Sequence, residues 1–387
     1  MFVQWFLPLC QSSVDMSLVV SECTVVDRMS PALLGRPKYW SRGVLVEESC
    51  RIYSAPYSAP HALCVDVARG TVEEVEPCGR GLRRYVAGGV RSPETGMVYF
   101  APYDAERVMC VDPRAGTASE IGPVLQGFEK YCADGILACN GSIYFAPCSA
   151  DRVLRVSPAD GTVEVVGPAL LGRNKFRASG ALSPASGCMY FAPCDADRAL
   201  AVNPACDDVK EIGPELPGDS KYQAGGAYFE GAVFFAPHSH FRVLRIDTST
   251  ETVDLVGPSY PGEGKYEAGG VLVPSTGRIY FAPCNTDRVL RIDATTSAVA
   301  EIGPIVGGGS FQYTARGVLA PSSGKIFFPP CNARAMLCVS SEDDSVEEVG
   351  PVLGGYDKYR AGGVLVPRLR TICFAPHAAH RVLRVRF

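Results

Sequence analysis

Hydrophobic and polar positions alternate along this chain in short runs that turn residues separate. Between residues 269 and 303 the runs are GGVLVP (269–274), RIYFAP (278–283), RVLRID (288–293) and AVAEIG (298–303). Runs rich in Val, Ile, Tyr and Phe and bounded by Gly, Pro, Ser, Thr or Asp are typical of β-strands. No stretch of the sequence keeps the spacing of an amphipathic helix over three turns, so the pattern predicts an all-β protein.

The same four runs recur eight times. Each repeat is anchored by an Ala-Pro step (Pro-Pro in the seventh), and the anchors stand 44 to 47 residues apart at Pro56, Pro102, Pro147, Pro193, Pro237, Pro283, Pro330 and Pro376. A fixed period in this range indicates a propeller or a solenoid. Four antiparallel strands per repeat make a propeller blade, whereas a β-solenoid would use shorter coils.

The two ends of the chain each hold part of one repeat. The eighth repeat stops at its third strand, RVLRVRF (381–387), while CTVVD (23–27) matches the fourth strands TVEEV (71–75) and TVEVV (162–166). Pairing the first strand with the last completes the eighth blade and removes an exposed strand edge. We therefore predict one eight-bladed β-propeller domain over residues 23–387, of eight repeats of about 46 residues, preceded by an N-terminal extension (1–22).

The repeat carries the patterns G-x-L-x-P-x-x-G-x-I-Y-F-A-P and R-V-L-R-I-D-x-x-T-G-T-V. With these it resembles the YVTN, NHL and streptogramin-lyase-like class of propeller repeats over about residues 23–387. The Trp-Asp dipeptide of WD40 repeats is missing, and Gly-Gly opens a strand instead of closing one as in kelch repeats. The resemblance implies a propeller, but it implies no single activity, because the class contains enzymes, sensors and scaffolds.

Glycines mark two structural positions of the repeat, whose strands we letter a to d outward from the axis. The turns between strands c and d, such as VDPRAGT (111–117), place Gly where a left-handed backbone is expected. The start of strand a is also glycine in every repeat, which we interpret as close approach of crowded blades near the axis. These residues are Gly43, Gly89, Gly135, Gly180, Gly226, Gly270, Gly317 and Gly363.

A basic residue and an aromatic residue precede strand a in the loop that enters it from strand d. The pairs are Lys38-Tyr39, Arg84-Tyr85, Lys130-Tyr131, Lys175-Phe176, Lys221-Tyr222, Lys265-Tyr266 and Lys358-Tyr359, with Gln312-Tyr313 in blade 7. Symmetry places them on one face with the arginines of the b–c loops, Arg107, Arg152, Arg198, Arg242, Arg288 and Arg381. One interpretation is structural ion pairing, with the tyrosines packed on the Ala-Pro steps. The other is an electropositive, aromatic rim that binds an anionic ligand or an acidic protein segment.

Blade 7 departs from the repeat at several positions. Gln312 replaces the basic residue, Ala335 stands where the b–c loop arginine would fall, and three glycines occupy 307–309. Asymmetry of this kind is what a functional site on a symmetric scaffold should show. We therefore expect blade 7 to be an atypical sector.

The residue after each Ala-Pro or Pro-Pro step, here called the slot residue, changes between blades. The slot residues are Tyr57, Tyr103, Cys148, Cys194, His238, Cys284, Cys331 and His377. Packed sheets lie about 10 Å apart, whereas two thiolates on one zinc ion lie within about 4 Å and a disulfide needs Cα atoms within about 7 Å. Slots of adjacent blades are therefore too far apart to share a metal or a disulfide. We predict no metal or cofactor, with the slot side chains packed beneath the neighbouring loop.

Four histidines are the remaining catalytic candidates. His238 and His240 share one b–c loop, and His377 and His380 share another. The resemblance to streptogramin lyases implies a catalytic histidine with a partner acid on this face, but no residue-by-residue match of the motif supports carrying that role over. The sequence contains no GxSxG, HExxH or Walker A motif.

Composition narrows the class of protein. The 387 residues are 47% hydrophobic and 20% charged with a net charge of −4, which suits a large core and argues against generic nucleic-acid binding. No apolar run approaches the roughly 18–20 residues that cross a bilayer, and MFVQWFLPLC (1–10) lacks the basic region of a signal peptide. The sixteen cysteines form no CxxC pair and are typical of small buried side chains in a reducing compartment. We expect a cytoplasmic monomer that binds neither nucleic acid nor membrane.

Two functions remain open. The favoured hypothesis is a non-enzymatic propeller that presents its d–a and b–c loops to a protein segment or an anionic small molecule. The alternative is a lyase-type or lactone-hydrolase-type enzyme at the channel mouth, with histidines of blades 5 and 8 as candidates. A binding ring should depend weakly on many lysines, whereas an enzyme should depend on one histidine. The sequence identifies neither the ligand nor the role of residues 1–22.

Overall fold

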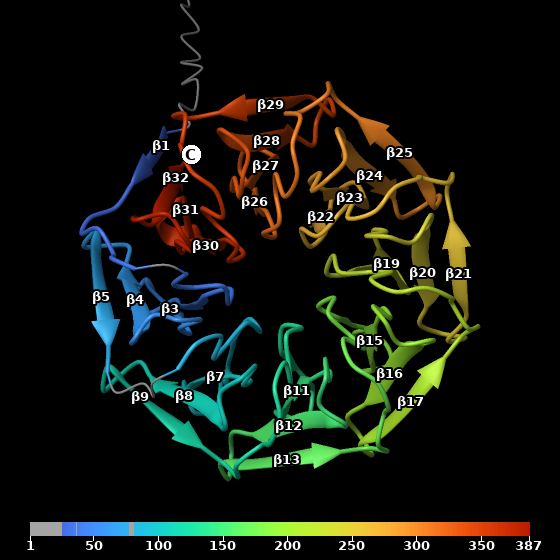
Figure 1. The fold of residues 1–387 in the computed structure, drawn as a ribbon, viewed down its shortest axis with the longest axis horizontal. Helices are drawn as coiled ribbons and strands as arrows, with labels where there is room; N and C mark the ends of the chain where they lie inside the picture. Colours follow the sequence, from blue (N-terminus) through green and yellow to red (C-terminus); the bar gives the residue numbers. More distant parts are fainter. Residues whose placement is uncertain (1–24, 36, 77–80) are drawn as a thin grey trace, which may run out of the picture.

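A computed structural model describes residues 25–35, 37–76 and 81–387. Its strands form eight separate four-stranded antiparallel sheets, arranged as a ring around a central axis (Figure 1). The only helix in these ranges is the 3-10 turn η1 (Pro367–Leu369), and no described helix could span a membrane. The prediction of an all-β, eight-bladed propeller is confirmed.

The blades follow one another along the chain. Blade 1 contains β2 (Val44–Val46), β3 (Arg51–Ser54), β4 (Ala62–Asp66) and β5 (Thr71–Val75). Blade 2 contains β6 (Val90–Arg91), β7 (Val98–Phe100), β8 (Val108–Asp112) and β9 (Thr117–Ile121). Blade 3 contains β10 (Ile136–Leu137), β11 (Ile143–Phe145), β12 (Val153–Ser157) and β13 (Thr162–Val166). Blade 4 contains β14 (Ala181–Leu182), β15 (Met189–Phe191), β16 (Ala199–Asn203) and β17 (Asp208–Ile212).

The second half of the ring repeats this order. Blade 5 contains β18 (Ala227–Phe229), β19 (Ala232–Phe235), β20 (Val243–Asp247) and β21 (Val253–Val256). Blade 6 contains β22 (Val271–Val273), β23 (Arg278–Phe281), β24 (Val289–Asp293) and β25 (Ala298–Ile302). Blade 7 contains β26 (Val318–Ala320), β27 (Lys325–Phe328), β28 (Met336–Ser340) and β29 (Val346–Val349). Blade 8 contains β30 (Val364–Val366), β31 (Thr371–Phe374), β32 (Leu383–Arg386) and β1 (Val25–Arg28).

Blade 8 closes the ring with strands from both ends of the chain. β1 pairs antiparallel with β32 from Val25 opposite Arg386 to Arg28 opposite Leu383. The Asp27 carboxylate accepts two hydrogen bonds from Arg384, both 2.8 Å, and one from Arg386 at 2.6 Å. Closure by the N-terminal strand is thus confirmed, although residues 1–22 and the predicted first residues of that strand, 23 and 24, lie outside the described residues.

The hydrophobic core lies between neighbouring blades. In one cluster, Tyr99 and Val108 of blade 2 pack against Phe145 and Leu154 of blade 3, and all four are at most 3% exposed. The glycines that start strand a permit this packing: a Cβ on Gly89 would lie 2.4 Å from the Phe100 ring. These glycines allow a close approach, which we expected from the neighbouring blade. The closest group, however, is mostly the aromatic ring on strand b of the same blade, because that ring lies across the start of strand a.

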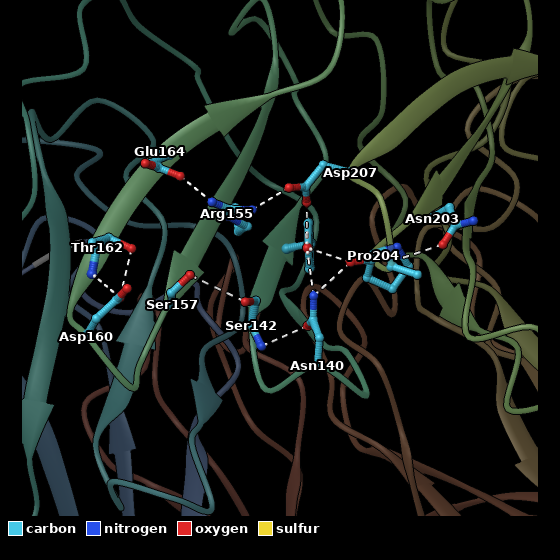
Figure 2. A network of polar contacts seen from close by, with 12 residues as sticks. Asn140, Ser142, Arg155, Ser157, Asp160, Thr162, Glu164, Asn203, Pro204 and Asp207 are labelled. Atoms are coloured by element: carbon cyan, nitrogen blue, oxygen red, sulfur yellow. Dashed lines mark hydrogen bonds and ion pairs between the residues drawn. The ribbon is translucent and has the colours of Figure 1, made fainter.

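The turns between strands c and d also contact the neighbouring blade. Gly116 has the expected left-handed backbone (φ 67°), but blade 4 uses Asp207 there (φ 54°). The Asp207 carboxylate accepts a 2.7 Å hydrogen bond from Tyr144 of blade 3 and forms an ion pair with Arg155 of that blade (Figure 2). Asn140 adds a 2.8 Å bond to the carbonyl of Pro204 (Figure 2). We expected these turns to need only a glycine, but the turn of blade 4 also links two blades through hydrogen bonds and an ion pair.

Backbone hydrogen bonds connect all eight blades in a closed circuit. Within each blade, the N–H of the slot residue donates to the carbonyl of the basic position, meaning Lys38, Arg84, Lys130, Lys175, Lys221, Lys265, Gln312 or Lys358, at 2.7–2.9 Å. Between blades, the N–H of the next basic position donates to the slot carbonyl at 2.8–3.1 Å. The circuit closes where Lys38 donates to His377 at 3.0 Å. Backbone atoms make these bonds, so the slot side chain is free to differ between blades.

We predict that a chain lacking residues 1–28 loses at least ~3 kcal/mol of unfolding free energy. Deleting β1 removes the four paired residues along β32, each bond contributing about 1 kcal/mol, and leaves Arg384 without its carboxylate. Urea denaturation followed by circular dichroism measures this loss. A chain lacking only residues 1–24 keeps β1 and is the control. Equal urea midpoints for the two truncations would contradict closure by β1.

Candidate functional site

The lysines of the basic–aromatic pairs lie inside the d–a loops. They are only 1–3% exposed. Each ammonium donates to the carbonyl three residues earlier, for example Lys130 to Gly127 at 2.7 Å and Lys358 to Gly355 at 2.8 Å. Burial lowers the pKa of Lys265 to about 8. The same contact is made by Lys38, Lys175, Lys221 and Lys265. These cations therefore stabilise the loop backbone from within, and their predicted role in ligand binding stays a prediction.

The paired tyrosines are buried in the same way. Tyr39, Tyr85, Tyr131, Tyr222, Tyr266, Tyr313 and Tyr359 are at most 1% exposed. Their hydroxyls donate to carbonyls of the b–c loop, as Tyr131 does to Arg152 at 3.1 Å and Tyr359 to Arg381 at 2.9 Å. They are thus placed to brace the two loops of one blade against each other. Arg84, the basic residue of blade 2, donates to the carbonyls of Ala59 and Pro60.

Four arginines of the b–c loops donate hydrogen bonds to backbone carbonyls at the end of the outer strand. Arg152 donates to the carbonyl of Gly167 at 3.1 Å, and Gly167 ends strand d of the same blade. Arg107, Arg198 and Arg288 make the corresponding contact with Gly122, Gly213 and Gly303. These four arginines are therefore engaged with the backbone at the periphery of the blades.

A cavity of about 120 Å³ lies where the strands a begin, at the end of the channel that carries the d–a loops. Two positions of the loop frame Lys-Tyr-x-Ala-x-Gly supply its walls. The first position contributes Trp40, Val86, Cys132, Arg177, Gln223, Glu267, Thr314 and Arg360. The second contributes Arg42, Asp134, Ser179, Gly225, Gly269, Arg316 and Gly362. Every blade therefore presents side chains that differ from its neighbours' to one shared central space.

Sequence reasoning missed these residues because it followed what repeats. The signal that could have found them is variation between blades at fixed positions of the repeat. In a frame repeated eight times, these two positions change from blade to blade, while Gly holds in all eight and Tyr and Ala in seven each, with Phe176 and Ser41 as the exceptions. Variation confined to fixed positions of a strict repeat indicates residues that the blade itself does not need.

Positive charge predominates in the cavity. Four guanidinium groups, Arg42, Arg177, Arg316 and Arg360, face two carboxylates, Asp134 and Glu267. Asp134 forms an ion pair with Arg42, with 3.8 Å between its Oδ2 and the Nε atom of the arginine. Arg360 pairs at 2.7 Å with a carboxylate behind the wall, that of Asp357.

Two of the cavity arginines have no carboxylate partner among the described residues. Arg177 makes one hydrogen bond, at 3.4 Å to the Oδ1 atom of Asn174, and Arg316 makes none that involves its side chain. Burial and then the neighbouring Arg42 lower the pKa of Arg316 to about 10, so it remains protonated at neutral pH. An unpaired cation held away from bulk water is costly, and an anion in the cavity would compensate it.

Burial opposes ionisation of the Glu267 carboxyl group. It raises the pKa of this group, and the nearby guanidinium groups of Arg360 and Arg177 only partly oppose this. The Cys284 thiol donates to its Oε2 at 3.6 Å. A carboxyl that holds its proton to higher pH leaves the cavity more cationic than its residue count indicates.

Trp40 in the cavity wall is part of an aromatic cluster whose other members lie behind the wall. The Arg360 guanidinium lies 4.7 Å from the centre of the Trp40 ring, and the rings of Tyr57 and His377 lie 5.1 and 5.4 Å from it. Tyr57 and His377 are slot residues of adjacent blades 1 and 8, with ring centres 5.5 Å apart. We expected adjacent slots to be too far apart to share a metal or a disulfide, and this stays a prediction. The two rings reach each other because both side chains are large.

None of the described histidines lines the central cavity. His238 is directed at the carbonyl of Ser220, with its Nδ1 at 3.1 Å, and His240 stacks on Tyr222 at 5.3 Å. Burial lowers the pKa of His377 to about 4, so this imidazole is neutral at physiological pH. His380 lies in a separate lateral groove beside Lys358. Catalysis by these histidines stays a prediction.

No protein-family model matches this chain, and no curated protein does. Among solved structures it is similar to virginiamycin B lyase from Staphylococcus aureus (TM-score 0.57, 16% identity, covering 79% of this chain and 94% of the lyase). It is also similar to a streptogramin B lyase (TM-score 0.54, 14% identity, 94% and 97% covered). Hydrazine synthase from Kuenenia stuttgartiensis gives a TM-score of 0.58 at 11% identity, with 92% and 98% covered. At these identities the likeness shows the fold alone, and at that level it confirms the resemblance expected from the repeat.

Replacing Glu267 with glutamine should flatten the dependence of stability on pH. Because the folded chain holds this proton to higher pH than the unfolded chain does, stability falls as the pH rises through the raised pKa. Glutamine cannot ionise, so the melting temperature of E267Q relative to wild type should increase between about pH 5 and pH 8. Calorimetry over this range measures the difference. Parallel profiles would show that the Glu267 carboxyl ionises as freely as in water.

Proposed function

We propose that this propeller binds an anionic ligand in its central cavity, through the guanidinium groups of Arg42, Arg177, Arg316 and Arg360. The observation that carries the proposal is the pair of arginines, Arg177 and Arg316, that line the cavity without a carboxylate partner among the described residues. Guanidinium groups bind carboxylates and phosphates through paired hydrogen bonds. The rest of the anion-binding face expected from the repeat stays a prediction, since its lysines are turned into the loops.

The size of the cavity limits what enters it. About 120 Å³ is below the roughly 300 Å³ of an ordinary small-molecule site. A small anion fits this space, and so does the charged end of a protein side chain or segment whose remainder stays outside. Both belong to the hypothesis of a non-enzymatic binding protein. A monomeric, cytoplasmic form remains a prediction of the sequence.

An enzymatic use of the cavity is the alternative, and one observation favours it. Glu267 keeps its proton to higher pH than an ordinary glutamate and lines the same space as the cationic groups. A protonated carboxyl beside a bound anion can act as a general acid. In that case E267Q would abolish turnover and keep anion binding, whereas a binding protein would have no turnover to lose.

Replacing Arg316 with glutamine should weaken anion binding at least about tenfold, since a hydrogen bond to a charged group contributes about 1.5–3 kcal/mol. Thermal-shift titrations would use inorganic phosphate, inositol hexakisphosphate and a Glu-rich peptide at two salt concentrations. A ligand at about 100 times its Kd adds about 2.7 kcal/mol of stability. The shift should shrink in Arg316→Gln and in Arg177→Gln.

Two variants are matched controls for this titration. Arg152→Gln removes an arginine that serves the backbone of strand d, and Lys265→Met replaces a buried ammonium with an apolar chain of similar length. Both should bind the anion as wild type does. If Lys265→Met lost binding and Arg316→Gln kept it, the anion would bind at the ring of lysines and not in the cavity. That result would contradict the proposal.

A further inference from the structure

In blades 1 and 6 the slot side chain lies against the first cavity-lining residue of its own blade. In blade 1, Tyr57 lies 5.1 Å from Trp40 between ring centres. In blade 6, the Sγ atom of Cys284 lies 3.6 Å from Oε2 of Glu267. The backbone circuit imposes this arrangement, because the slot N–H is bonded to the carbonyl two residues before the cavity-lining position.

Blade 3 alone among the eight has cysteine at both of these positions. Cys132 lines the cavity and Cys148 occupies the slot. The Cys148 N–H donates to the carbonyl of Lys130 at 2.8 Å, so the two cysteines sit on adjoining segments of backbone. The two side chains are close enough for each thiol to alter the pKa of the other. Both cysteines belong to one blade, so the distance that separates the slots of adjacent blades does not apply to them.

Both thiols also contact the same segment of blade 4. Cys132 Sγ lies 3.9 Å from the carbonyl oxygen of Phe176, and Cys148 Sγ lies 3.8 Å from Oδ1 of Asn174. The next residue of that segment is Arg177, whose guanidinium also contacts Asn174. The pair is therefore held from two sides, beside a cation that has no carboxylate partner in the described part of the chain.

The electrostatics distinguish Cys148 from the other buried slot thiols, whereas interaction with Cys148 and then burial raise the pKa of Cys132. The hydrogen bond from Cys132 and the charge of Arg177 lower the pKa of Cys148 despite its burial. By contrast, burial raises the pKa of Cys194 and Cys284, which occupy slots in blades 4 and 6. Thiolate is the form that reacts with oxidants, and a neighbouring cation favours it.

We propose that Cys132 and Cys148 are a redox-active dithiol on the wall of the central cavity, which peroxide converts reversibly to a disulfide. One thiolate attacks a peroxide oxygen, giving a sulfenic acid and hydroxide, which takes up a proton to become water. The second thiol then attacks the sulfenic sulfur, forming the S–S bond and releasing water. Two thiols and one hydrogen peroxide thus become one disulfide and two waters, and a dithiol reductant reverses the change. Cys132 gives the oxidant access, since it is partly exposed to the cavity.

The test uses the full chain with its exposed cysteines, Cys139 and Cys206, replaced by serine, together with Cys10, Cys23 and Cys78. The protein is treated with an equivalent of hydrogen peroxide, alkylated, digested and mapped by mass spectrometry. We expect a linked peptide pair containing Cys132 and Cys148, the loss of two hydrogen atoms, and full reversal by dithiothreitol. Alkylation of both thiols after oxidation, or a disulfide between other cysteines, would overturn the proposal.

Two further variants separate chemistry from proximity. Arg177→Gln should slow disulfide formation at neutral pH at least about threefold and shift its rate profile to higher pH, because the cation that favours thiolate is gone. Cys284→Ser is the matched control in another slot and should leave the rate unchanged. An unchanged pH–rate profile in Arg177→Gln would contradict the role of that cation. The peptide map of Cys132 and Cys148 is made on a chain without either substitution, so it does not depend on the stability of these variants.

Discussion

The ring depends on the circuit of backbone hydrogen bonds between slot and basic positions. Each blade is bonded to the next through the same N–H and carbonyl groups, and the circuit returns to its start where Lys38 meets His377. Because no side chain makes these bonds, slot residues as different as Tyr57 and Cys148 fit the same backbone. The buried lysines support the arrangement by donating to loop carbonyls that would otherwise lack a partner. A scaffold fixed through its backbone leaves its innermost side chains free to differ, and the cavity is built from those side chains.

This separation explains why the site is asymmetric although the fold is not. Seven blades contribute to the cavity from the same two positions and blade 2 from the first alone, so the side chains at those positions determine where charge lies in the space. The guanidinium groups come from blades 1, 4, 7 and 8, whereas blades 2 and 5 contribute Val86 and Gln223. Blade 7, which was expected to be atypical, contributes Arg316 to the cavity and fills its basic position with the buried amide of Gln312.

Much of the fold could be predicted from the sequence, since strand runs and a period of about 46 residues are local and repeated. Closure could be predicted because Val25–Arg28 resembles the outer strands of other blades. The location of Lys221 and its equivalents could not, because a repeated lysine is compatible with a surface ring as well as with a carbonyl contact inside a loop. The contact between Tyr57 and His377 was missed because the spacing of packed sheets describes backbones, and two large side chains can reach across it. The cavity was missed because positions that vary carry no period.

The pairing of β1 with β32 also has a consequence for synthesis. Asp27 and Arg384 are 357 residues apart in the chain, so the first strand leaves the ribosome long before its partner exists. At about 5–20 residues per second, the interval is roughly 20–70 seconds. During that time the growing ring is an open arc, in which β1 has no partner strand and the end blades expose apolar faces to other nascent chains. For this protein, the interval before the last blade is complete is the period in which chaperones matter most.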